Sequence, residues 1–166
     1  MTCLRGYAVL LTLPVFASCT SPPTPSARVV WSGVYTANVD RRVVHPEAIV
    51  GTRAYVSAVR PLQDTRVVSA QLGTRFGLQY EIVGPPRGTV VTLQAKNIFP
   101  AVGLTNPVTG RHATFDERDV QCIVGTKCLH GRGFSEPWEL VPGVWTFQIL
   151  LNGSLLLSHD IEVVIP

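Results

Sequence analysis

Cys122 and Cys128 are the two side chains in this sequence whose spacing most directly suggests chemistry. Their thiols could form a disulfide, or could bind a metal together with His112 or His130. Structural zinc sites favour cysteines about two to four residues apart, and this pair is more widely spaced. Thiols in an oxidising compartment most often pair with each other. Given the N-terminal segment described below, we expect a Cys122–Cys128 disulfide and no metal, with a metal-binding or sensor protein as the alternative.

Carboxylates gather at residues 116–119, which read Asp-Glu-Arg-Asp. Two carboxylates can hydrolyse a glycoside when they lie about 5–10 Å apart across a substrate, and neighbours in one loop rarely reach that geometry. We therefore expect a solvated turn at this position. A weak calcium site is the lesser alternative.

Hydrolase chemistry would need a nucleophile, a base and an orienting acid, and His159-Asp160 could supply two of these. The sequence lacks the Gly-x-Ser-x-Gly elbow, because residues 133–137 depart from it at the last position. An enzyme would also bring several ionisable side chains together in one pocket. The candidates for such a pocket are His112, His130, His159, Glu136 and Asp119. We expect a non-enzymatic protein without a cofactor, and keep an envelope hydrolase with its site in residues 97–139 as the alternative.

The segment 97–139 is the candidate binding region because glycine and proline recur along it. Irregular connections on a β-scaffold often carry recognition. The candidate binding residues are Phe99, Phe115, His130, Arg132, Phe134 and Trp138. For the aromatic members, the alternative is that they cap the hydrophobic core.

The first nineteen residues combine Arg5, an apolar run over residues 7–16 and a cysteine that follows small residues. A membrane-spanning helix needs about 20 apolar residues, and this run is shorter and contains Pro14. Phe16-Ala17-Ser18-Cys19 resembles the lipobox of bacterial lipoproteins. The resemblance implies cleavage before Cys19 and acylation of its sulfur and amine, and several acyl chains make such an anchor stable. An ordinary secretory signal is the alternative.

These features divide the chain into three parts. We expect a lipoprotein signal peptide over residues 1–18, a linker rich in proline, serine and threonine over 19–27 that carries the lipidated Cys19, and one domain over 28–166. Thr20 stands where an aspartate would retain a Gram-negative lipoprotein on the inner membrane. We therefore expect a lipid-anchored protein of the cell envelope on the outer membrane, facing the periplasm. Its partner would be an envelope protein or a small ligand.

Composition favours an all-β domain and argues against nucleic acid as a partner. The formal net charge is only +3, and the basic residues do not form a stripe, whereas nucleic-acid-binding domains carry clustered basic residues. Charged residues make up 15% of the chain, against about 25% in an average domain. The 14 glycines and 13 prolines indicate many turns, and β-branched residues favour strands.

Alternating apolar residues are clearest over residues 145–151, and they predict a strand with one buried face. Asn152-Gly153 predicts a type I′ hairpin. Leu155 and Leu157 would continue the buried face on the partner strand. His159 has the parity of an inward residue, so we expect it near the rim of the sheet or displaced by a bulge.

Further strands are expected near residues 31–39, 45–59, 76–82 and 91–95, with weaker signals at 67–72 and 114–124. No segment has the period of a long amphipathic helix. About seven or eight strands separated by frequent turns predict an immunoglobulin-like antiparallel β-sandwich. Trp145 follows Pro142-Gly143 and could tie the strand entry through its indole, although we favour a plain core position.

Three motifs carry a resemblance to a known family. They are Gly33-Val34-Tyr35, Leu72-Gly73-Thr74-Arg75-Phe76-Gly77 and Pro142-Gly143-Val144-Trp145-Thr146-Phe147. Together with the Gly84-Pro85-Pro86 turn, they resemble the uncharacterised bacterial family DUF3859 over most of residues 28–166. The resemblance implies a small envelope or secreted β-domain, and it implies no activity or catalytic residues.

Overall fold

The structure is a computed structural model, and it describes residues 25–84 and 86–166. The predicted signal peptide, Cys19 and the linker as far as Thr24 lie outside these residues. Within the described part, the chain is all-β, as predicted, with a single short 3-10 helix. No helix there is long and apolar enough to cross a membrane.

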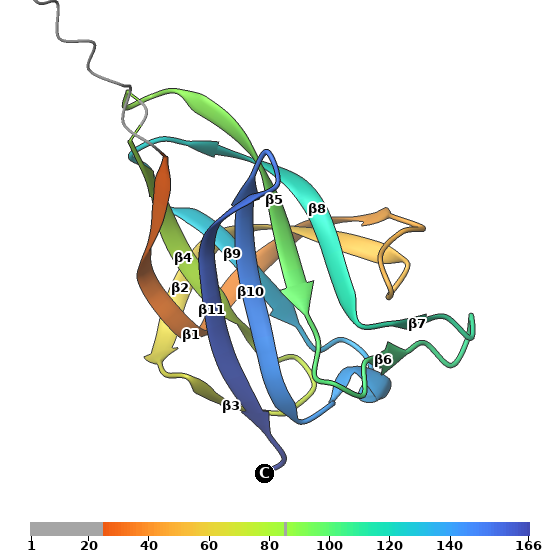
Figure 1. Cartoon of the computed structure of the whole chain (residues 1–166). Coiled ribbons are helices and arrows are strands. Elements are labelled where there is room, and N and C mark those ends of the chain that lie inside the picture. Colours follow the sequence, from red (N-terminus) through yellow and green to blue (C-terminus); the bar gives the residue numbers. More distant parts are fainter. Residues whose placement is uncertain (1–24, 85) are drawn as a thin grey trace, which may run out of the picture.

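Two sheets pack face to face (Figure 1). The first has the order β2-β1-β4-β9 and the second the order β3-β11-β10-β5-β8. The strands of the first sheet are β1 (Ser26–Val44), β2 (Thr52–Asp64), β4 (Arg75–Val83) and β9 (Cys128–Gly133). Those of the second are β3 (Val67–Ser69), β5 (Val90–Ile98), β8 (Phe115–Ile123), β10 (Gly143–Leu151) and β11 (Ser154–Val164). Every pairing in them is antiparallel except that of β3 with β11.

A small hairpin of β6 (Leu104–Thr105) and β7 (His112–Ala113) and the 3-10 helix η1 (Pro137–Glu139) complete the fold. The antiparallel sandwich expected from the sequence is confirmed, but the described residues form eleven strands rather than about seven or eight. The weaker signal at 67–72 contains β3, and the strands without a signal in the sequence are β9, β6 and β7, of which β6 and β7 have only two residues each. Strands of this length are too short to show a period of two in the sequence.

The segment 97–139 is not an irregular connection, because it contains β6, β7, β8, β9 and η1. The acidic run 116–119 lies within β8, so the prediction of a solvated turn is wrong. Asp116, Arg118, Val120 and Cys122 all share the less exposed face of this strand. Charged residues on an inward face hide the apolar alternation by which a strand is recognised.

The Asn152-Gly153 turn is the predicted type I′ hairpin between β10 and β11. Asn152 has φ +50° and Gly153 has φ +79°, and this turn type needs positive φ at both positions. A register shift follows, since Ile149 pairs with Leu157 while Leu150 pairs with Leu155. The bulge leaves Leu155 54% exposed, so its predicted burial is wrong. His159 lies beyond the bulge and is buried opposite Phe147.

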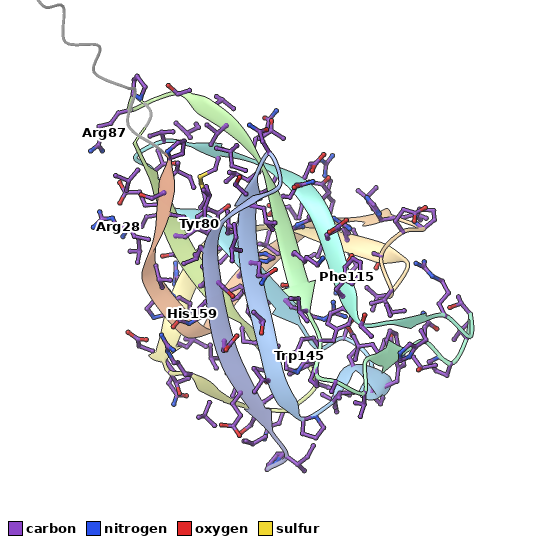
Figure 2. The ribbon with its side chains drawn as sticks, viewed as in Figure 1. Arg28, Tyr80, Arg87, Phe115, Trp145 and His159 are labelled. Carbon is purple, nitrogen blue, oxygen red and sulfur yellow. A yellow bond between two sulfur atoms is a disulfide. The ribbon has the colours of Figure 1, made fainter. Side chains whose placement is uncertain are left out.

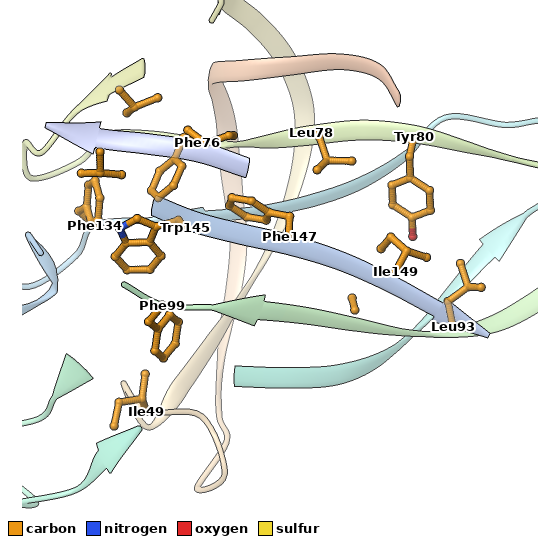
Figure 3. Packing of buried hydrophobic residues seen from close by; sticks show 14 of the residues in the cluster. Ile49, Phe76, Leu78, Tyr80, Leu93, Phe99, Phe134, Trp145, Phe147 and Ile149 are labelled. Atoms are coloured by element: carbon orange, nitrogen blue, oxygen red, sulfur yellow. The ribbon is translucent and has the colours of Figure 1, made fainter. Parts of the chain in front are cut away.

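An aromatic cluster fills the core between the sheets (Figure 3). Phe76 packs against Phe134 with ring centroids 4.9 Å apart and meets Trp145 edge-on at 5.6 Å. The indole Nε1 of Trp145 also donates a hydrogen bond to the carbonyl oxygen of Val141 at 3.0 Å. Trp145 therefore belongs to the core, as favoured from the sequence. Its hydrogen bond to Val141 also holds the segment that enters β10 in place.

The far halves of β1 and β2 form an arm, residues 36–57, which leaves the sandwich (Figure 1). Residues 26–35 of β1 pair with β4, and residues 33–44 pair with β2. Three register shifts interrupt the β1–β2 pairing, and such bulges bend and twist a β-ribbon. The arm therefore turns across the side of the sandwich toward β8.

The tip of the arm docks on the β6–β7 hairpin. Asn106 Nδ2 donates to the carbonyl oxygen of Ile49 at 2.9 Å, and Arg111 donates to the carbonyl oxygens of Pro46 and Glu47. Ile49 is buried and lies beside Phe99 at the border of the core (Figure 3). These contacts fix the position of the arm against the body of the domain.

Candidate binding cleft

A cleft of about 350 Å³ lies between the arm and the side of the sandwich where β8 and β9 run. Its lining comes from both strands of the arm, from β9 and the start of β4, and from β5 and β8 of the second sheet. The sheet order places β9 and β8 at the edges of their sheets. The arm therefore covers a side of the sandwich that would otherwise be open.

Arginine is the dominant ionisable residue of this cleft. The lining arginines are Arg42, Arg53, Arg75, Arg118 and Arg132, and the lining acids are Asp116, Glu117 and Glu139. The arginines come from five different strands. Only the tertiary fold brings them together, and the cleft is consequently cationic.

Asp116 links the arm to β9 through two of these arginines. Its Oδ1 lies 3.2 Å from Arg53 Nη2, and its Oδ2 lies 4.0 Å from Arg132 Nη1. Arg53 also donates to the carbonyl oxygen of Glu117 at 2.8 Å. All three paired side chains are largely shielded from solvent, with 17% exposure for Asp116, 11% for Arg53 and 7% for Arg132.

Glu139 forms the second anchor for Arg132. Its Oε1 accepts a hydrogen bond from Arg132 Nη2 at 2.6 Å, and its Oε2 accepts from the Ser135 amide and hydroxyl and from the Glu136 amide at 2.8–2.9 Å. The Glu139 carboxylate is buried and fully occupied by these donors. Charge-assisted bonds of this kind are the strong ones, so this end of the cleft is structurally fixed.

Arg118 differs from Arg53 and Arg132, because no carboxylate of the described residues lies within 4.0 Å of its guanidinium. It projects from the same face of β8 as Asp116 and is partly buried. Burial lowers the pKa of Arg118, and the nearby Arg53 guanidinium lowers it further, while Asp116 acts in the opposite direction. The group is thus a cation that its surroundings do not neutralise.

Tyr35 and Arg75 lie over the glycines of β9. A methyl group placed on Gly131 would come within 2.6 Å of the Tyr35 hydroxyl, and one on Gly133 within 3.2 Å of Arg75 Cγ. Burial raises the pKa of Tyr35, and the positive charges of Arg75 and Arg118 oppose that rise. The Tyr35 hydroxyl is therefore protonated at neutral pH and is a hydrogen-bond donor close to two arginines.

Three buried polar atoms of cleft residues have no hydrogen-bond partner within the described part of the chain. They are Arg53 Nε, Arg132 Nε and Asn97 Oδ1. Most buried polar atoms in proteins are satisfied, and exceptions concentrate at functional sites or where a water or ion completes the network. The other three such atoms belong to His45, His130 and His159, which do not line the cleft. Half of the unpartnered buried polar atoms of the described residues therefore lie in the cleft lining.

The predicted binding residues divide between cleft, core and surface. Arg132 and Phe134 line the cleft, although Phe134 is a core residue, as is Phe99. Trp138 packs partly buried against that core. Phe115 is 45% exposed on β8 (Figure 2), where Lys96 Nζ lies 3.9 Å from its ring centroid.

His130 is buried on the inward face of β9 and packs edge-on against Phe147. Its Nε2 donates to the carbonyl oxygen of Lys96 across 3.1 Å. Burial lowers the pKa of His130 to about 4, although that hydrogen bond acts in the opposite direction. The imidazole is therefore neutral at pH 7 and is a core group rather than part of the cleft lining.

The Cys122–Cys128 disulfide is present, as predicted, and links the end of β8 to the start of β9 with a Cα–Cα distance of 6.0 Å. It leaves neither thiol free for a metal. Across the described ranges, no cluster of three or more histidine, cysteine, aspartate or glutamate side chains has the geometry of a metal site.

The residues named for a hydrolase are not brought together in the cleft, which none of them lines. His112 is exposed and pairs with Thr105 Oγ1 at 3.0 Å. His159 lies on β11 of the second sheet, and Asp119 and Glu136 are exposed.

Sequence reasoning missed Tyr35, Arg53, Arg75 and Arg118 as cleft residues. The sequence predicts a turn at Arg118, and the other three residues lie outside the candidate binding segment 97–139. Asp116 and Arg118, which alternate with exposed residues on β8, are the signal in the sequence that could have indicated the cleft. A strand with charged residues on its buried face must place them in a polar site.

Two packed, mainly antiparallel sheets and a bulged first hairpin that bears the arm define an immunoglobulin-like β-sandwich protein. The model of the family described as "Domain of unknown function (DUF3859)" matches residues 24–163, and the chain belongs to this family.

A solved structure of an immunoglobulin-like protein from Pseudomonas aeruginosa is similar, with a TM-score of 0.57 and 23% sequence identity, covering 84% of this chain and 97% of that chain. This likeness confirms the fold. A Pseudomonas fluorescens alkylpurine DNA glycosylase bound to DNA containing an abasic site analogue matches with a TM-score of 0.38 and 17% identity, over 59% of this chain and 27% of that chain. That match carries no inference about this protein. A search of the curated proteins finds no match.

Proposed function

We propose that this protein is a non-enzymatic binding module of the bacterial cell envelope and that the cleft beneath the arm is its binding site. The observation that carries the proposal is a cleft of about 350 Å³ in which two partly buried arginines, Arg75 and Arg118, have no carboxylate within 4.0 Å among the described residues. Small-molecule sites usually occupy about 300–1,000 Å³. A small ligand, rather than a protein surface, is therefore the partner that the cleft suits.

The envelope location rests on the N-terminal sequence. Arg5, the apolar run and the lipobox-like Phe16-Ala17-Ser18-Cys19 support export and acylation of Cys19. The Cys122–Cys128 disulfide agrees with an oxidising compartment. In this proposal the acyl chains attach the protein to the outer membrane, and the segment after Cys19 holds the domain in the periplasm.

Mass spectrometry of the full-length protein, purified in detergent from its host membrane, tests both parts of the proposal. We expect a chain that begins at acylated Cys19, and, under native conditions, a further mass from a bound small molecule. A mature chain without acyl mass would contradict the anchor.

A variant that fills the cleft tests the site. Thr52 lines the cleft from the arm, so Thr52→Trp should abolish the bound mass. Thr92→Trp is the matched control, because Thr92 is exposed on β5 and does not line the cleft. Equal ligand occupancy in the two variants, or no bound mass in the unmodified protein, would refute the binding site.

A further inference from the structure

We infer that the ligand of this cleft carries an oxyanion, a phosphate or carboxylate group, which Arg118 and Arg75 bind with the Tyr35 hydroxyl. The inference rests on the proposed function for the location of the site and adds the chemistry of what occupies it. It follows from the balance of charge, from the pairing of each ionic group and from the space that the glycines of β9 leave.

The cleft lining carries more positive than negative side chains. Five arginines and three acids line the cleft, and the acids are already engaged. Glu139 is saturated by Arg132 and three further donors, Asp116 lies between Arg53 and Arg132, and Glu117 pairs with Lys96 at 3.7 Å. A cationic ligand would consequently meet no free carboxylate among the described residues.

Arg118 is the group that most needs a partner. It is partly buried beside the Arg53 guanidinium, and no carboxylate within 4.0 Å pairs with it. A charge removed from water is costly unless it is paired and hydrogen-bonded. An oxyanion at this position would neutralise it, and the planar guanidinium matches the two oxygens of a carboxylate or phosphate.

The side chains over β9 add two further groups to the cleft lining, and both Arg75 and Arg118 lie close enough to Tyr35 to act on its pKa. Gly131 and Gly133 leave room for Tyr35 and Arg75, whose atoms would lie 2.6 Å and 3.2 Å from a methyl group at these two positions. Arg75, like Arg118, has no carboxylate within 4.0 Å in the described part of the chain. The protonated Tyr35 hydroxyl adds a donor without charge, which suits an oxygen acceptor.

A second hollow of about 260 Å³ offers a contrast within the same molecule. It lies between β1, β2, β3 and the β3–β4 connection, and none of its lining residues is ionisable. The cleft beneath the arm and this hollow therefore differ in charge, and arginines line the cleft alone of the two.

Calorimetric titration of the full-length lipidated protein in detergent, at fixed ionic strength, tests the inference with pyrophosphate and citrate as probes. We expect at least one of them to bind. Arg118→Gln should weaken that binding by about tenfold or more, which corresponds to about 1.4 kcal/mol. The probe that binds distinguishes a phosphate ligand from a carboxylate ligand.

Arg28→Gln is the matched control, because Arg28 is exposed, pairs with Glu81 and lies on the opposite side of the molecule from Phe115 of β8 (Figure 2). Its affinity for the probe should be unchanged. Without ligand, Arg118→Gln should unfold at the same or a higher temperature than the unmodified protein, since it removes an unpaired cation. Arg75→Gln supplies a second variant with the same expected loss of affinity.

Absence of binding by both probes at millimolar concentration, or equal affinity in Arg118→Gln and the unmodified protein, would overturn the inference. A neutral molecule in the cleft, detected by the native mass measurement above, would also overturn it while leaving the binding module intact. If native mass spectrometry of the unmodified protein detects no bound molecule, the proposed function itself is refuted.

Discussion

Arg132 and Arg118 lie in the same cleft and have different surroundings. Arg132 pairs with Glu139 at 2.6 Å and also lies over Phe99 and Trp145, with Cζ 4.9 Å and 5.4 Å from the ring centroids. These contacts connect Arg132 to the core and give it a structural role. Arg118 has no such contacts to acids, and an unpaired cation in a concave site is a candidate for ligand recognition.

His130 predicts a dependence of stability on acid. Because burial lowers the pKa of His130 to about 4 from an ordinary 6.5, the unfolded chain binds a proton at a higher pH than the folded chain does. The stability contributed by neutral His130 is therefore complete above about pH 7 and decreases as pH falls from about 6.5 toward 4. In this window it should change by up to about 1.4 kcal/mol per pH unit.

Urea unfolding between pH 7 and pH 5 measures this effect. His159 acts in the same direction, because burial lowers its pKa and the positive charge of Arg66 lowers it further. Variants must therefore separate the contributions of His130 and His159. His130→Gln should reduce the slope of stability against pH, and His159→Gln should reduce it separately. NMR titration of the His130 ring is a second measurement, and a midpoint near 6.5 would contradict the prediction.

Among the elements, the first sheet is built around a row of three paired glycines. Gly33 of β1 pairs with Gly77 of β4, and Gly77 pairs with Gly131 of β9. A Cβ on Gly77 would come within 2.4 Å of the backbone of β9. The bare backbone at Gly131 leaves room for the ring of Tyr35, so glycine at this position in β9 shapes one wall of the cleft.

Gly131→Ala should destabilise the domain by about 1–3 kcal/mol, as overpacking generally does. The added methyl would lie 2.6 Å from the Tyr35 hydroxyl and 3.0 Å from the carbonyl oxygen of Phe76. Urea denaturation at pH 7 measures the loss.

Tyr35→Phe in the same chain separates the clash with the hydroxyl from those with the Tyr35 ring at 2.9 Å and with the Phe76 carbonyl oxygen. It removes the hydroxyl oxygen but keeps the ring, so the double variant should recover part of the loss, and the double-mutant cycle should show a favourable coupling. Strict additivity of the two single changes would mean that Gly131 does not make room for the Tyr35 hydroxyl.

At the scale of the whole molecule, the arm and the sandwich enclose the cleft together. β1 begins at the end of the domain that carries the β10–β11 turn, and the C-terminus lies at the other end (Figure 1). The arm crosses the side between them and is held at its tip by the β6–β7 hairpin. The cleft therefore depends on contacts between segments more than fifty positions apart in the sequence.

Asn106→Ala tests this dependence. Asn106 is buried, donates to the Ile49 carbonyl oxygen, and accepts from the Val108 and Thr109 amides at 2.9 Å and 3.2 Å. Its removal should cost about 1–3 kcal/mol and should accelerate hydrogen exchange in residues 45–57 more than in β10 and β11. Thr105→Ala is the control, since Thr105 is exposed and bonds His112 within the same hairpin. Equal exchange in both variants would mean that Asn106 does not hold the arm.

Local patterns were sufficient for the fold class, the Asn152-Gly153 hairpin, the disulfide and the core role of Trp145. Each of these depends on neighbours in sequence, because side-chain alternation, turn dihedrals and a short cysteine spacing are local properties. The family resemblance read from three motifs is likewise confirmed by the match to residues 24–163. The lipid anchor at Cys19 stays a prediction from sequence.

Only the tertiary structure located the cleft beneath the arm. Its cationic side chains come from five strands, and they meet because bulges in the β1–β2 pairing bend the arm toward β8. The sequence alone shows that Asp116 and Arg118 would share one face of a strand. It does not show whether a carboxylate from another strand lies close enough to pair with Arg118. Pairing of distant charges is decided by long-range packing, for which a local pattern carries no information.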